Sequence, residues 1–405
     1  KAATVSIEFW ENGSEERLHS ESSKEKTHHR ITLLKLKPNT KYNHQFILES
    51  GKEVVRTKIH TFVTDSLPVF LPEMTLVTDS GNVFEGYILI RNVQNPGQQI
   101  MIDNQGKIVW YQVFDTTLFR PFSWTEDQTI LALKSDKAIH EMNLNGDVTF
   151  KLEYGEADFD ELLHHEILRD RNGNLISLTR NNQVFDLSGI MGSLSDTMKG
   201  DGIIVLNSAG RKIWTWSIFD HIDPLKDPDI LKSKDDWSHA NSIGIDVDGH
   251  YLVSFRHFNQ VWKIHSGTGE IIWKLGRNGD LKMQEDQYFY LQHAAHINSF
   301  SGLMLFDNGG PGRMTSRAIS FTIDKQSKQV RTGKINVFLP KSLFSFKQGS
   351  AYLIEDDKVL ICSSIKKSIV ITDLEGNILW HLKLSESVYR ANYIEQVDWL
   401  STVKN

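Results

Sequence analysis

Short stretches in which apolar and polar residues alternate recur along the whole chain and predict β-strands from end to end. Examples are residues 3–10 (ATVSIEFW), 42–50 (YNHQFILES) and 55–64 (VRTKIHTFVT). Alternation with a period of two is the pattern of a strand with one buried face. Strands do not alternate with helical segments, which argues against a parallel α/β sheet. The predicted fold class is therefore all-β.

The first 66 residues hold one group of such strands, which also includes residues 28–36 (HHRITLLKL). Within the group, Leu36-Lys-Pro-Asn-Thr-Lys-Tyr42 resembles the turn-plus-tyrosine signature at a strand corner of fibronectin-type sandwiches. Ser66-Leu67-Pro68 follows as a junction. We therefore predict a small, fibronectin-like β-sandwich domain over residues 1–66 and a second domain over residues 67–405.

A second pattern repeats after the junction, in which a turn, usually with glycine, precedes an alternating strand. Four copies end the strand with a tryptophan, namely Trp110, Trp214, Trp273 and Trp380. A copy after Gly146 and a glycine-free copy at 325–330 bring the number of units to six, spaced irregularly by inserts such as 219–237. Repeats of this kind predict a six-bladed β-propeller over residues 67–405, with the tryptophans packed in its core.

Three histidines occupy matching places in successive units. His165, His239 and His293 each precede a small turn by seven to nine residues, and a hydrophobic strand follows that turn. If the repeats form a ring, equivalent positions point toward one common centre. We therefore expect the three imidazoles to meet at one mouth of the central channel.

Polar residues near the same register complete this predicted cluster. Arg180 and Arg256 stand seven residues past the turn glycine in two of the units, and Asn308 lies in the same region of the third. Asn241 follows His239 by two residues, so on an extended strand both side chains point to the same side. No carboxylate occupies the equivalent positions. The predicted cluster is cationic and rich in hydrogen-bond donors, which suits an oxygenated anion such as sulfate or phosphate.

Three further histidines, His164, His257 and His296, lie beside the cluster in sequence. Alternation along a strand aims His164 away from the face that His165 occupies, and the same holds for His257 beside Arg256. A single histidine near a strand is more often a structural hydrogen-bonding residue than a catalyst. We therefore assign all three to structural roles.

Composition excludes several classes of function. The net charge of −6 and the absence of a basic run argue against nucleic acid as a partner. The single cysteine, Cys362, excludes an internal disulfide and is expected to be a small buried hydrophobe. No apolar run is long enough to cross a bilayer, and strand-like sequence follows Lys1 directly, without a signal peptide. We expect a soluble, mature form.

Several motifs resemble those of a known family, the bacterial aryl sulfate sulfotransferases that use no nucleotide sulfate donor. The matching stretches are Trp237-Ser-His-Ala-Asn-Ser-Ile243, Ser254-Phe-Arg-His257, Val261-Trp-Lys-Ile264, Trp273-Lys-Leu-Gly276, Gln292-His293 and Phe306-Asp-Asn-Gly309. The resemblance runs from about Gly106 to the C-terminus, and a small N-terminal β domain also fits the architecture of the family. One departure is Ala294-Ala295-His296, where the family pattern has Asp or Thr and then a bulky residue.

The resemblance implies that the protein moves a sulfuryl group from a phenolic sulfate ester to a phenolic acceptor in a ping-pong cycle. It implies that His293 is the nucleophile, and that His239, Asn241 and Arg256 hold the sulfuryl oxygens. His165 matches a further family histidine, which we expect to exchange a proton with the phenol oxygen. No cofactor or metal is implied. The family acts outside the cytoplasm, and a homodimer is compatible with it.

Two other classes of function fit the same residues. His165, His239 and His293 are suitable ligands for Mn²⁺, Zn²⁺ or Fe²⁺, so a metal-dependent lyase or hydrolase on a propeller is the first alternative. The second alternative is a binding module, because a fold of this kind does not dictate catalysis.

Overall fold

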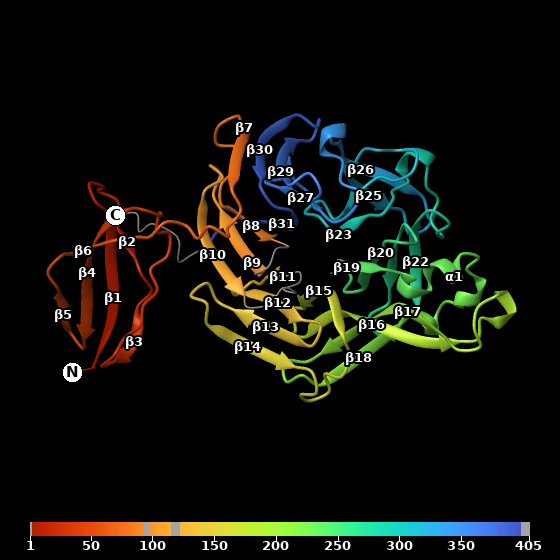
Figure 1. Ribbon diagram of the computed structural model, residues 1–405, viewed down its shortest axis with the longest axis horizontal. Coiled ribbons are helices and arrows are strands. Elements are labelled where there is room, and N and C mark those ends of the chain that lie inside the picture. Colours follow the sequence, from red (N-terminus) through yellow and green to blue (C-terminus); the bar gives the residue numbers. More distant parts are fainter. Residues whose placement is uncertain (1, 93–96, 115–121, 398–405) are drawn as a thin grey trace.

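The computed structural model describes residues 2–92, 97–114 and 122–397, and this part of the chain is nearly all strand and loop (Figure 1). Its one α-helix, α1 (Ile230–Ser233), has four residues, and a few 3₁₀ turns accompany it. The prediction of an all-β fold is confirmed.

The N-terminal region is one antiparallel sheet built on β1 (Ala3–Glu11) and β4 (Lys41–Ser50). The shorter strands β2 (Leu18–His19) and β3 (Ser23–Lys26) pair with β1, whereas β5 (Glu53–Arg56) and β6 (His60–Val63) pair with β4. Within residues 2–73 the described strands form this sheet alone, so the second sheet of a sandwich stays a prediction.

Residues 28–36 form no strand, and their assignment as one was wrong. The apolar side chains of this segment instead cover the N-terminal sheet, where Ile31 and Leu33 pack against Ile7 and Phe9. An irregular segment that covers a sheet buries alternate apolar residues just as a strand does, so alternation alone does not distinguish the two. In the turn-plus-tyrosine signature, the Tyr42 hydroxyl accepts a hydrogen bond of 2.9 Å from the Lys37 N–H.

Six further sheets follow in the described part of the chain, each antiparallel and at least four strands wide. In pairing order, the first sheet holds β31 (Val388–Ile394), β8 (Tyr87–Asn92), β9 (Gly97–Ile102) and β10 (Ile108–Phe114), and the second holds β11 (Phe122–Trp124), β12 (Ile130–Ser135), β13 (Ala138–Met142) and β14 (Val148–Glu153). The third holds β15 (Leu163–Arg169), β16 (Leu175–Phe185), β17 (Asp196–Leu206) and β18 (Lys212–Ser217), and the fourth holds β19 (Ala240–Ile245), β20 (Tyr251–Phe255), β21 (Gln260–Ile264) and β22 (Ile271–Gly276). The fifth holds β23 (His293–Ile297), β24 (Leu303–Asp307), β25 (Arg317–Ile323) and β26 (Val330–Phe338), and the last holds β27 (Ser350–Ile354), β28 (Lys358–Ser363), β29 (Ser368–Asp373), β30 (Ile378–Leu384) and β7 (Met74–Asp79). Figure 1 shows these sheets following one another around a common centre.

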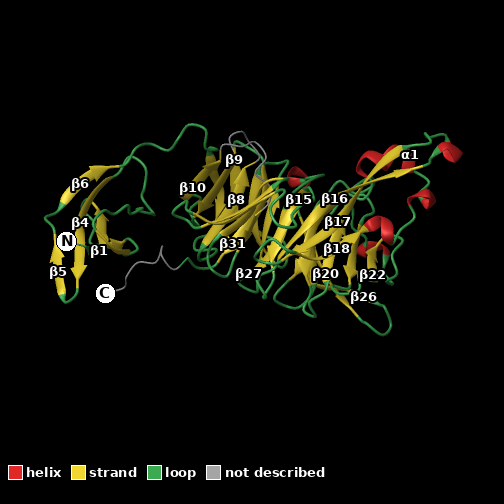
Figure 2. Ribbon diagram, turned by 90° about the horizontal axis from the view of Figure 1, so that it is seen from below, coloured by secondary structure: helices red, strands yellow, loops and turns green. Residues whose placement is uncertain are grey.

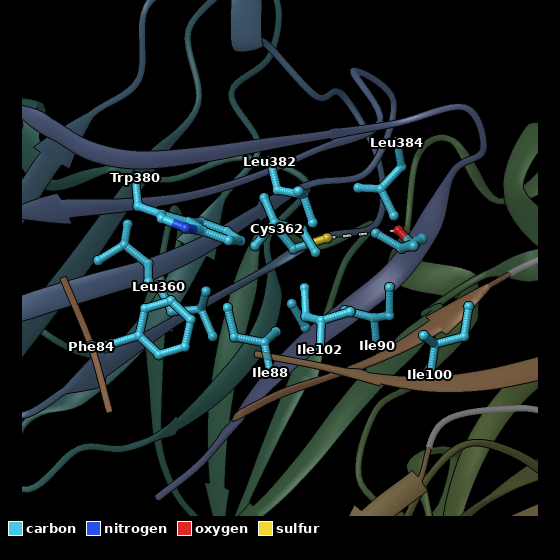
Figure 3. Close-up of a cluster of buried hydrophobic side chains, with 14 of the residues drawn as sticks. Phe84, Ile88, Ile90, Ile100, Ile102, Leu360, Cys362, Trp380, Leu382 and Leu384 are labelled. Carbon is cyan, nitrogen blue, oxygen red and sulfur yellow. Dashed lines mark hydrogen bonds between the residues drawn. The ribbon is translucent and has the colours of Figure 1, made fainter. Parts of the chain in front are cut away.

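Hydrophobic clusters join each of these sheets to the next. In the cluster of Figure 3, Cys362 and Trp380 of the last sheet pack against Ile88 and Ile90 of the first. Burial raises the pKa of the Cys362 thiol to about 12, which confirms the interpretation of this residue as a small hydrophobe. The C-terminal strand β31 completes the first sheet by pairing with β8, so the two ends of this region are joined through backbone hydrogen bonds.

The recurring tryptophans connect neighbouring sheets. The indole N–H of Trp110 donates to the Leu144 carbonyl in the turn of the next sheet, and Trp380 donates to Asn104 in the same way, both at 2.8 Å. Both residues are buried, as predicted. Trp214 is only half-buried, and the corresponding contact of its sheet comes from Trp216, which donates to the Gly269 carbonyl at 2.9 Å.

The insert between β18 and β19 is ordered by its own contacts and lies beside the long β16–β17 hairpin (Figure 2). Trp237 at its end is 2% exposed and stacks on Phe219, with ring centroids 5.6 Å apart. Its indole N–H donates to an oxygen of Asp227 at 2.8 Å. These contacts fix the residues that immediately precede His239.

Candidate functional site

The three predicted histidines stand at matching points of three neighbouring strands. His165 lies near the start of β15, His239 directly before β19, and His293 at the first position of β23. At each point the pairing register with the next strand shifts by a bulge. His165 and His239 themselves have a positive φ, of 56° and 47°. Bulges of this kind re-aim side chains and are common beside active sites.

The strand arrangement brings His165 and His239 together. Their ring centroids lie 5.3 Å apart in an edge-to-face arrangement. The backbone N–H of Arg256 donates to the His239 carbonyl at 3.0 Å, which places the backbone of the arginine beside His239. Burial lowers the pKa of His293, and the positive charges of Arg256, Arg390 and His239 lower it further, so these groups lie within electrostatic range of the ring. Arg180, a weaker candidate, is exposed.

His293 is buried, with 3% of its surface exposed, and both ring nitrogens have partners. Its Nδ1 lies 2.8 Å from Oδ1 of Asn308 and 3.0 Å from the carbonyl oxygen of Leu291. Its Nε2 accepts a hydrogen bond of 3.2 Å from the Gln348 N–H. Two acceptors at Nδ1 and one donor at Nε2 define a tautomer with the proton on Nδ1.

Asn308 fixes this tautomer. Its amide nitrogen donates to the carbonyl oxygens of Ser345 and Gln348, at 2.7 and 2.8 Å, so its oxygen must face His293. Burial lowers the pKa of His293 to about 3, and the hydrogen bond to Asn308 offsets only part of this shift. The imidazole is therefore neutral at pH 7 and carries its lone pair on Nε2.

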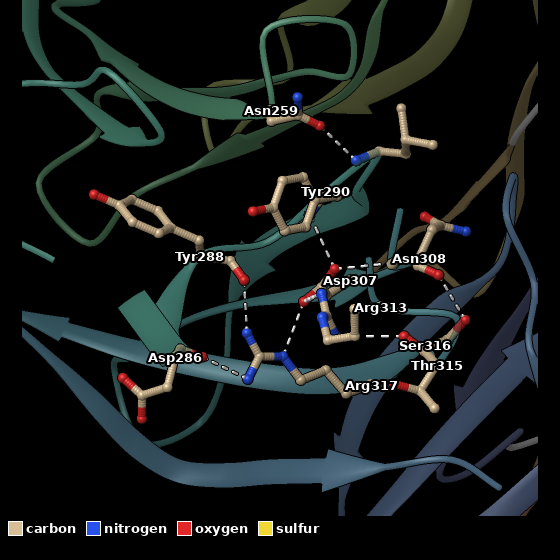
Figure 4. A network of polar contacts seen from close by, with 12 residues as sticks. Asn259, Asp286, Tyr288, Tyr290, Asp307, Asn308, Arg313, Thr315, Ser316 and Arg317 are labelled. Atoms are coloured by element: carbon tan, nitrogen blue, oxygen red, sulfur yellow. Dashed lines mark hydrogen bonds and ion pairs between the residues drawn. The ribbon is translucent and has the colours of Figure 1, made fainter. Parts of the chain in front are cut away.

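Asp307 holds the segment that leads into His293 (Figure 4). Its carboxylate accepts the backbone N–H of Tyr290 at 3.0 Å and pairs with Arg317 at 2.8 Å and with Arg313. Arg317 in turn donates to the Tyr288 carbonyl at 2.8 Å. The stretch Phe306–Gly309 thus positions both the backbone before His293 and, through Asn308, its ring.

Asn241 is fully buried and connects two of the sheets. Its amide nitrogen donates to the Gln292 carbonyl at 2.7 Å, which uses one of its two N–H donors. Within the described chain its side-chain oxygen has no hydrogen-bond partner. The amide thus keeps hydrogen-bonding capacity beside the residue that precedes His293.

Sequence reasoning missed a buried ion pair below these residues. Arg390 of β31 pairs with Glu166 of β15, and it also donates to the Asn241 carbonyl at 2.9 Å. Although burial alone would lower it, the Glu166 carboxylate holds the pKa of Arg390 above its usual value. One side chain therefore connects the first, third and fourth sheets. The two partners are 224 positions apart, and only the closing of β31 onto β8 brings them together.

The expectation that His164 faces away from His165 was wrong. The Nδ1 atoms of the two residues lie 2.8 Å apart, because the bulge turns the rings toward each other. His164 is otherwise buried, with its Nε2 3.0 Å from both the Thr179 carbonyl oxygen and an oxygen of Asp201, and its structural role stays a prediction. His296 packs against Tyr352, and burial lowers its pKa to about 4.

The assignment of His257 to the opposite face was wrong. Its ring centroid lies 4.8 Å from that of His239, and its Nε2 accepts a hydrogen bond of 3.0 Å from Arg256. His257 sits in the turn after β20, where strand alternation no longer applies. The sequence shows no carboxylate at the matched positions, but a carboxylate reaches the site from outside them. Oδ2 of Asp236, which lies in the insert, is 2.5 Å from Nδ1 of His239.

A cavity of about 1540 Å³ lies elsewhere in the molecule, between the N-terminal sheet and the first and last of the six sheets. Residues such as Tyr42, Pro68, Asp103 and Glu395 line it. The histidine cluster is not among its lining residues, so this cavity is separate from the candidate site.

A model of the arylsulfotransferase (ASST) family matches residues 63–368. Because this match spans more than half of the 405 residues, the chain belongs to the arylsulfotransferase family. Membership supports a transferase with arylsulfotransferase activity in general. None of the curated proteins compared matches the chain.

Solved structures resemble the chain at low identity. A protein of unknown function from Bacteroides caccae has 12% identity and a TM-score of 0.50, covering 77% of this chain and 100% of its own. Virginiamycin B lyase from Staphylococcus aureus has 10% identity and a TM-score of 0.40, covering 76% and 88%. The first likeness concerns the fold alone, and the second is too weak to support an argument. In the described residues, no helix is long and apolar enough to span a membrane.

Proposed function

We propose that the protein is an aryl sulfate sulfotransferase that works through a sulfated His293. One observation carries the proposal. The buried His293 is neutral and has its Nδ1–H held by Asn308, so the lone pair needed for attack stands on Nε2, and the positive charge of Arg256 lies near enough to lower the pKa of the ring. A neutral imidazole is a competent nucleophile near pH 7.

In the first half-reaction the Nε2 lone pair forms an N–S bond while the bond from sulfur to the aryl oxygen breaks. The aryl oxygen leaves with the bonding electrons and takes a proton from His165. Before attack, Nε2 exchanges its 3.2 Å contact with the Gln348 N–H for the sulfur. In the second half-reaction an incoming phenol gives its proton to His165 and takes the sulfuryl group from Nε2. Splitting the transfer in two lets the donor and the acceptor share one site.

Arg256, His239 and Asn241 hold the sulfuryl oxygens in this proposal. Sulfuryl transfer, like phosphoryl transfer, passes through a loose in-line transition state in which the oxygens carry negative charge. Burial lowers the pKa of Arg256 without bringing it near neutral pH, so the guanidinium stays charged. A well-aimed donor of this kind contributes about 3 kcal/mol to the stabilisation of the transition state.

We further propose that the six sheets are the blades of one propeller over residues 67–405, with a separate β-sandwich domain over 1–66. The pairing of β31 with β8, the clusters between successive sheets and the tryptophan contacts support a closed ring. In a closed ring His165, His239 and His293, one from each of three successive sheets, would meet at one mouth. By analogy with the family, we place the protein outside the cytoplasm and expect a homodimer.

A metal-dependent lyase or hydrolase is the second candidate, because ligand atoms of Asp236, His239 and His257 lie within 4.8 Å of one another. These are not the three histidines expected from the sequence. The guanidinium of Arg256 lies 3.0 Å from Nε2 of His257, which places a positive charge where the ion would bind. This favours an anion over a cation. Near-stoichiometric metal in the purified protein would favour the second candidate.

The test is mass spectrometry of the protein after incubation with 4-nitrophenyl sulfate in the absence of an acceptor. The expected result is one sulfuryl group on His293 and the release of nitrophenol. Subsequent addition of a phenol should remove the adduct and yield the aryl sulfate. A folded protein that forms no adduct and releases no nitrophenol would contradict the proposal.

A further inference from the structure

Asp236 contacts two different residues of the candidate site. It belongs to the 3₁₀ turn Lys234–Asp236 at the end of the insert between β18 and β19. Its side-chain Oδ2 lies 2.5 Å from Nδ1 of His239, and its backbone oxygen lies 2.6 Å from Nδ1 of His257. Neither Asp236 nor His257 has a role in the transfer described so far.

The first contact fixes the state of His239. Burial raises the pKa of Asp236, but the hydrogen bond from His239 and the neighbouring positive charges outweigh burial and hold that pKa below its usual value. An ionised carboxylate at Nδ1 requires a proton on that nitrogen. It therefore fixes the rotation and the tautomer of the ring, with the proton on Nδ1 and with Nε2 on the opposite side.

The second contact fixes His257 and, through it, Arg256. Because Nδ1 of His257 donates to the Asp236 carbonyl, its Nε2 carries the lone pair and accepts the Arg256 Nη1–H at 3.0 Å. Burial, together with the charge of His239, lowers the pKa of His257. The ring is therefore neutral at pH 7 and remains an acceptor that orients the guanidinium.

We propose that Asp236 is a positioning residue for sulfuryl transfer, which orients His239 directly and Arg256 through His257. The inference rests on the proposed function, since His239 and Arg256 are two of the residues assigned to the sulfuryl oxygens. The buried Trp237 next to it keeps Asp236 in place by stacking on Phe219. A carboxylate that fixes the orientation of a histidine acts on the reacting groups without touching the substrate.

The neighbouring Asp235 offers a matched control. Its side chain is 77% exposed and pairs with Lys199 at 3.5 Å. We expect Asp236→Asn to lower kcat/KM for transfer from 4-nitrophenyl sulfate by roughly 10- to 100-fold. Asp235→Asn makes the same chemical change one residue away and should leave kcat/KM unchanged. Equal activity in the two variants would overturn the proposal.

Nitrogen-15 NMR separates positioning from simple packing. His239 faces Asp236, His165, His257 and Arg256, and Asp236 is the carboxylate among these neighbours. Removing the carboxylate leaves Nδ1 without its acceptor, so Asp236→Ala should lower the share of the Nδ1–H tautomer of His239. Nitrogen-15 NMR of the imidazole, assigned by its loss in His239→Gln, distinguishes the two tautomers without any catalysis. Unchanged nitrogen-15 shifts of His239 would overturn the direct contact even if the protein transferred no sulfate.

Two variants of His257 test the path to Arg256 and do not depend on the folding of the Asp236 variant. His257→Gln keeps an acceptor for the guanidinium, whereas His257→Leu removes it at similar size. Calorimetry with inorganic sulfate should show affinity several-fold weaker for His257→Leu than for wild type, with His257→Gln close to wild type. Equal affinity in both variants would overturn this branch. Wild-type protein that neither binds sulfate nor forms the His293 adduct would instead refute the proposed function, and the NMR measurement of the His239 tautomer would still decide the role of Asp236.

Discussion

His293 and His239 occupy equivalent positions in neighbouring sheets, yet their surroundings differ in charge. His293 is 3% exposed and its Nδ1 faces the neutral amide of Asn308. The His239 side chain is 24% exposed and its Nδ1 faces the carboxylate of Asp236. Both partners place a proton on Nδ1, so in both rings Nε2 is the nitrogen on the side away from that partner. The amide is neutral, whereas the carboxylate carries a negative charge.

This difference assigns different chemistry to two residues that the repeat pattern made equivalent. A nucleophile needs an unprotonated Nε2, which burial beside an amide provides. A residue proposed to hold sulfuryl oxygens needs a fixed orientation, and the Asp236 carboxylate holds the His239 ring in one. The repeat places His293 and His239 at matching strand positions, and the partner of Nδ1 distinguishes the two.

Replacing His293 by alanine should have the largest effect. We expect the transfer of the sulfuryl group to fall by about 10⁴-fold or more, because the variant has no group that can carry it between donor and acceptor. Steady-state kinetics with 4-nitrophenyl sulfate and a phenol measure this, with the exposed His28→Ala as the control. Full transfer activity in His293→Ala would refute the mechanism and the comparison with His239.

Replacing Arg256 by methionine should cost roughly 10²- to 10³-fold in kcat, the loss typical of one donor aimed at transition-state charge. Lysine at this position keeps the charge but loses the planar fork, so Arg256→Lys should recover only part of the activity. The comparison to measure is kcat against KM for the donor. A loss confined to KM would mean that Arg256 binds the ground state and the transition state equally.

Exchanging the partner of His293 should give it the electrostatics of His239. In Asn308→Asp a carboxylate faces Nδ1, which should raise the pKa of His293 above its present value of about 3. We expect transfer to fall about tenfold at pH 6 and less at pH 8, because the protonated ring has no lone pair for attack. Asn308→Ala, which adds no charge, should lower activity equally at both pH values. A flat pH profile in Asn308→Asp would contradict the role assigned to the amide.

Much of this arrangement could be predicted from the sequence, because units that share a local pattern occupy equivalent places in the fold. Alternation located most strands, and matched spacing selected His165 and His239, whose ring centroids lie 5.3 Å apart, and Arg256, whose N–H donates to the His239 carbonyl. Alternation failed where backbone geometry departs from a regular strand. Residues 28–36 cover the N-terminal sheet without joining it, and the bulge at His165 turns His164 toward its neighbour.

The charged partners could not be predicted because they come from outside the repeat. Asp236 belongs to an insert whose path depends on the packing of Trp237 against Phe219. Glu166 and Arg390 meet only because the C-terminal strand returns to the first sheet. Asn308 was noted by its position, but its role follows from backbone carbonyls of a loop some 40 residues away in sequence. Spacing carries no information on such contacts.

His296 shares the buried surroundings of His293 without a predicted role in transfer, so it separates the effect of burial from that of catalysis. Burial lowers its pKa from 6.5 to about 4. The unfolded chain therefore binds a proton on His296 below pH 6.5, whereas the folded protein binds it only below about pH 4. The free energy of unfolding falls as the pH decreases through this range. Between pH 7 and pH 5 this effect lowers the free energy of unfolding by about 2 kcal/mol, and we expect that part of the decrease to be absent in His296→Gln. Urea unfolding at the two pH values measures it, and transfer at pH 7 should stay within about twofold of wild type, since none of the assigned sulfuryl contacts is lost. An unchanged pH dependence of stability would show that His296 is not held neutral by burial.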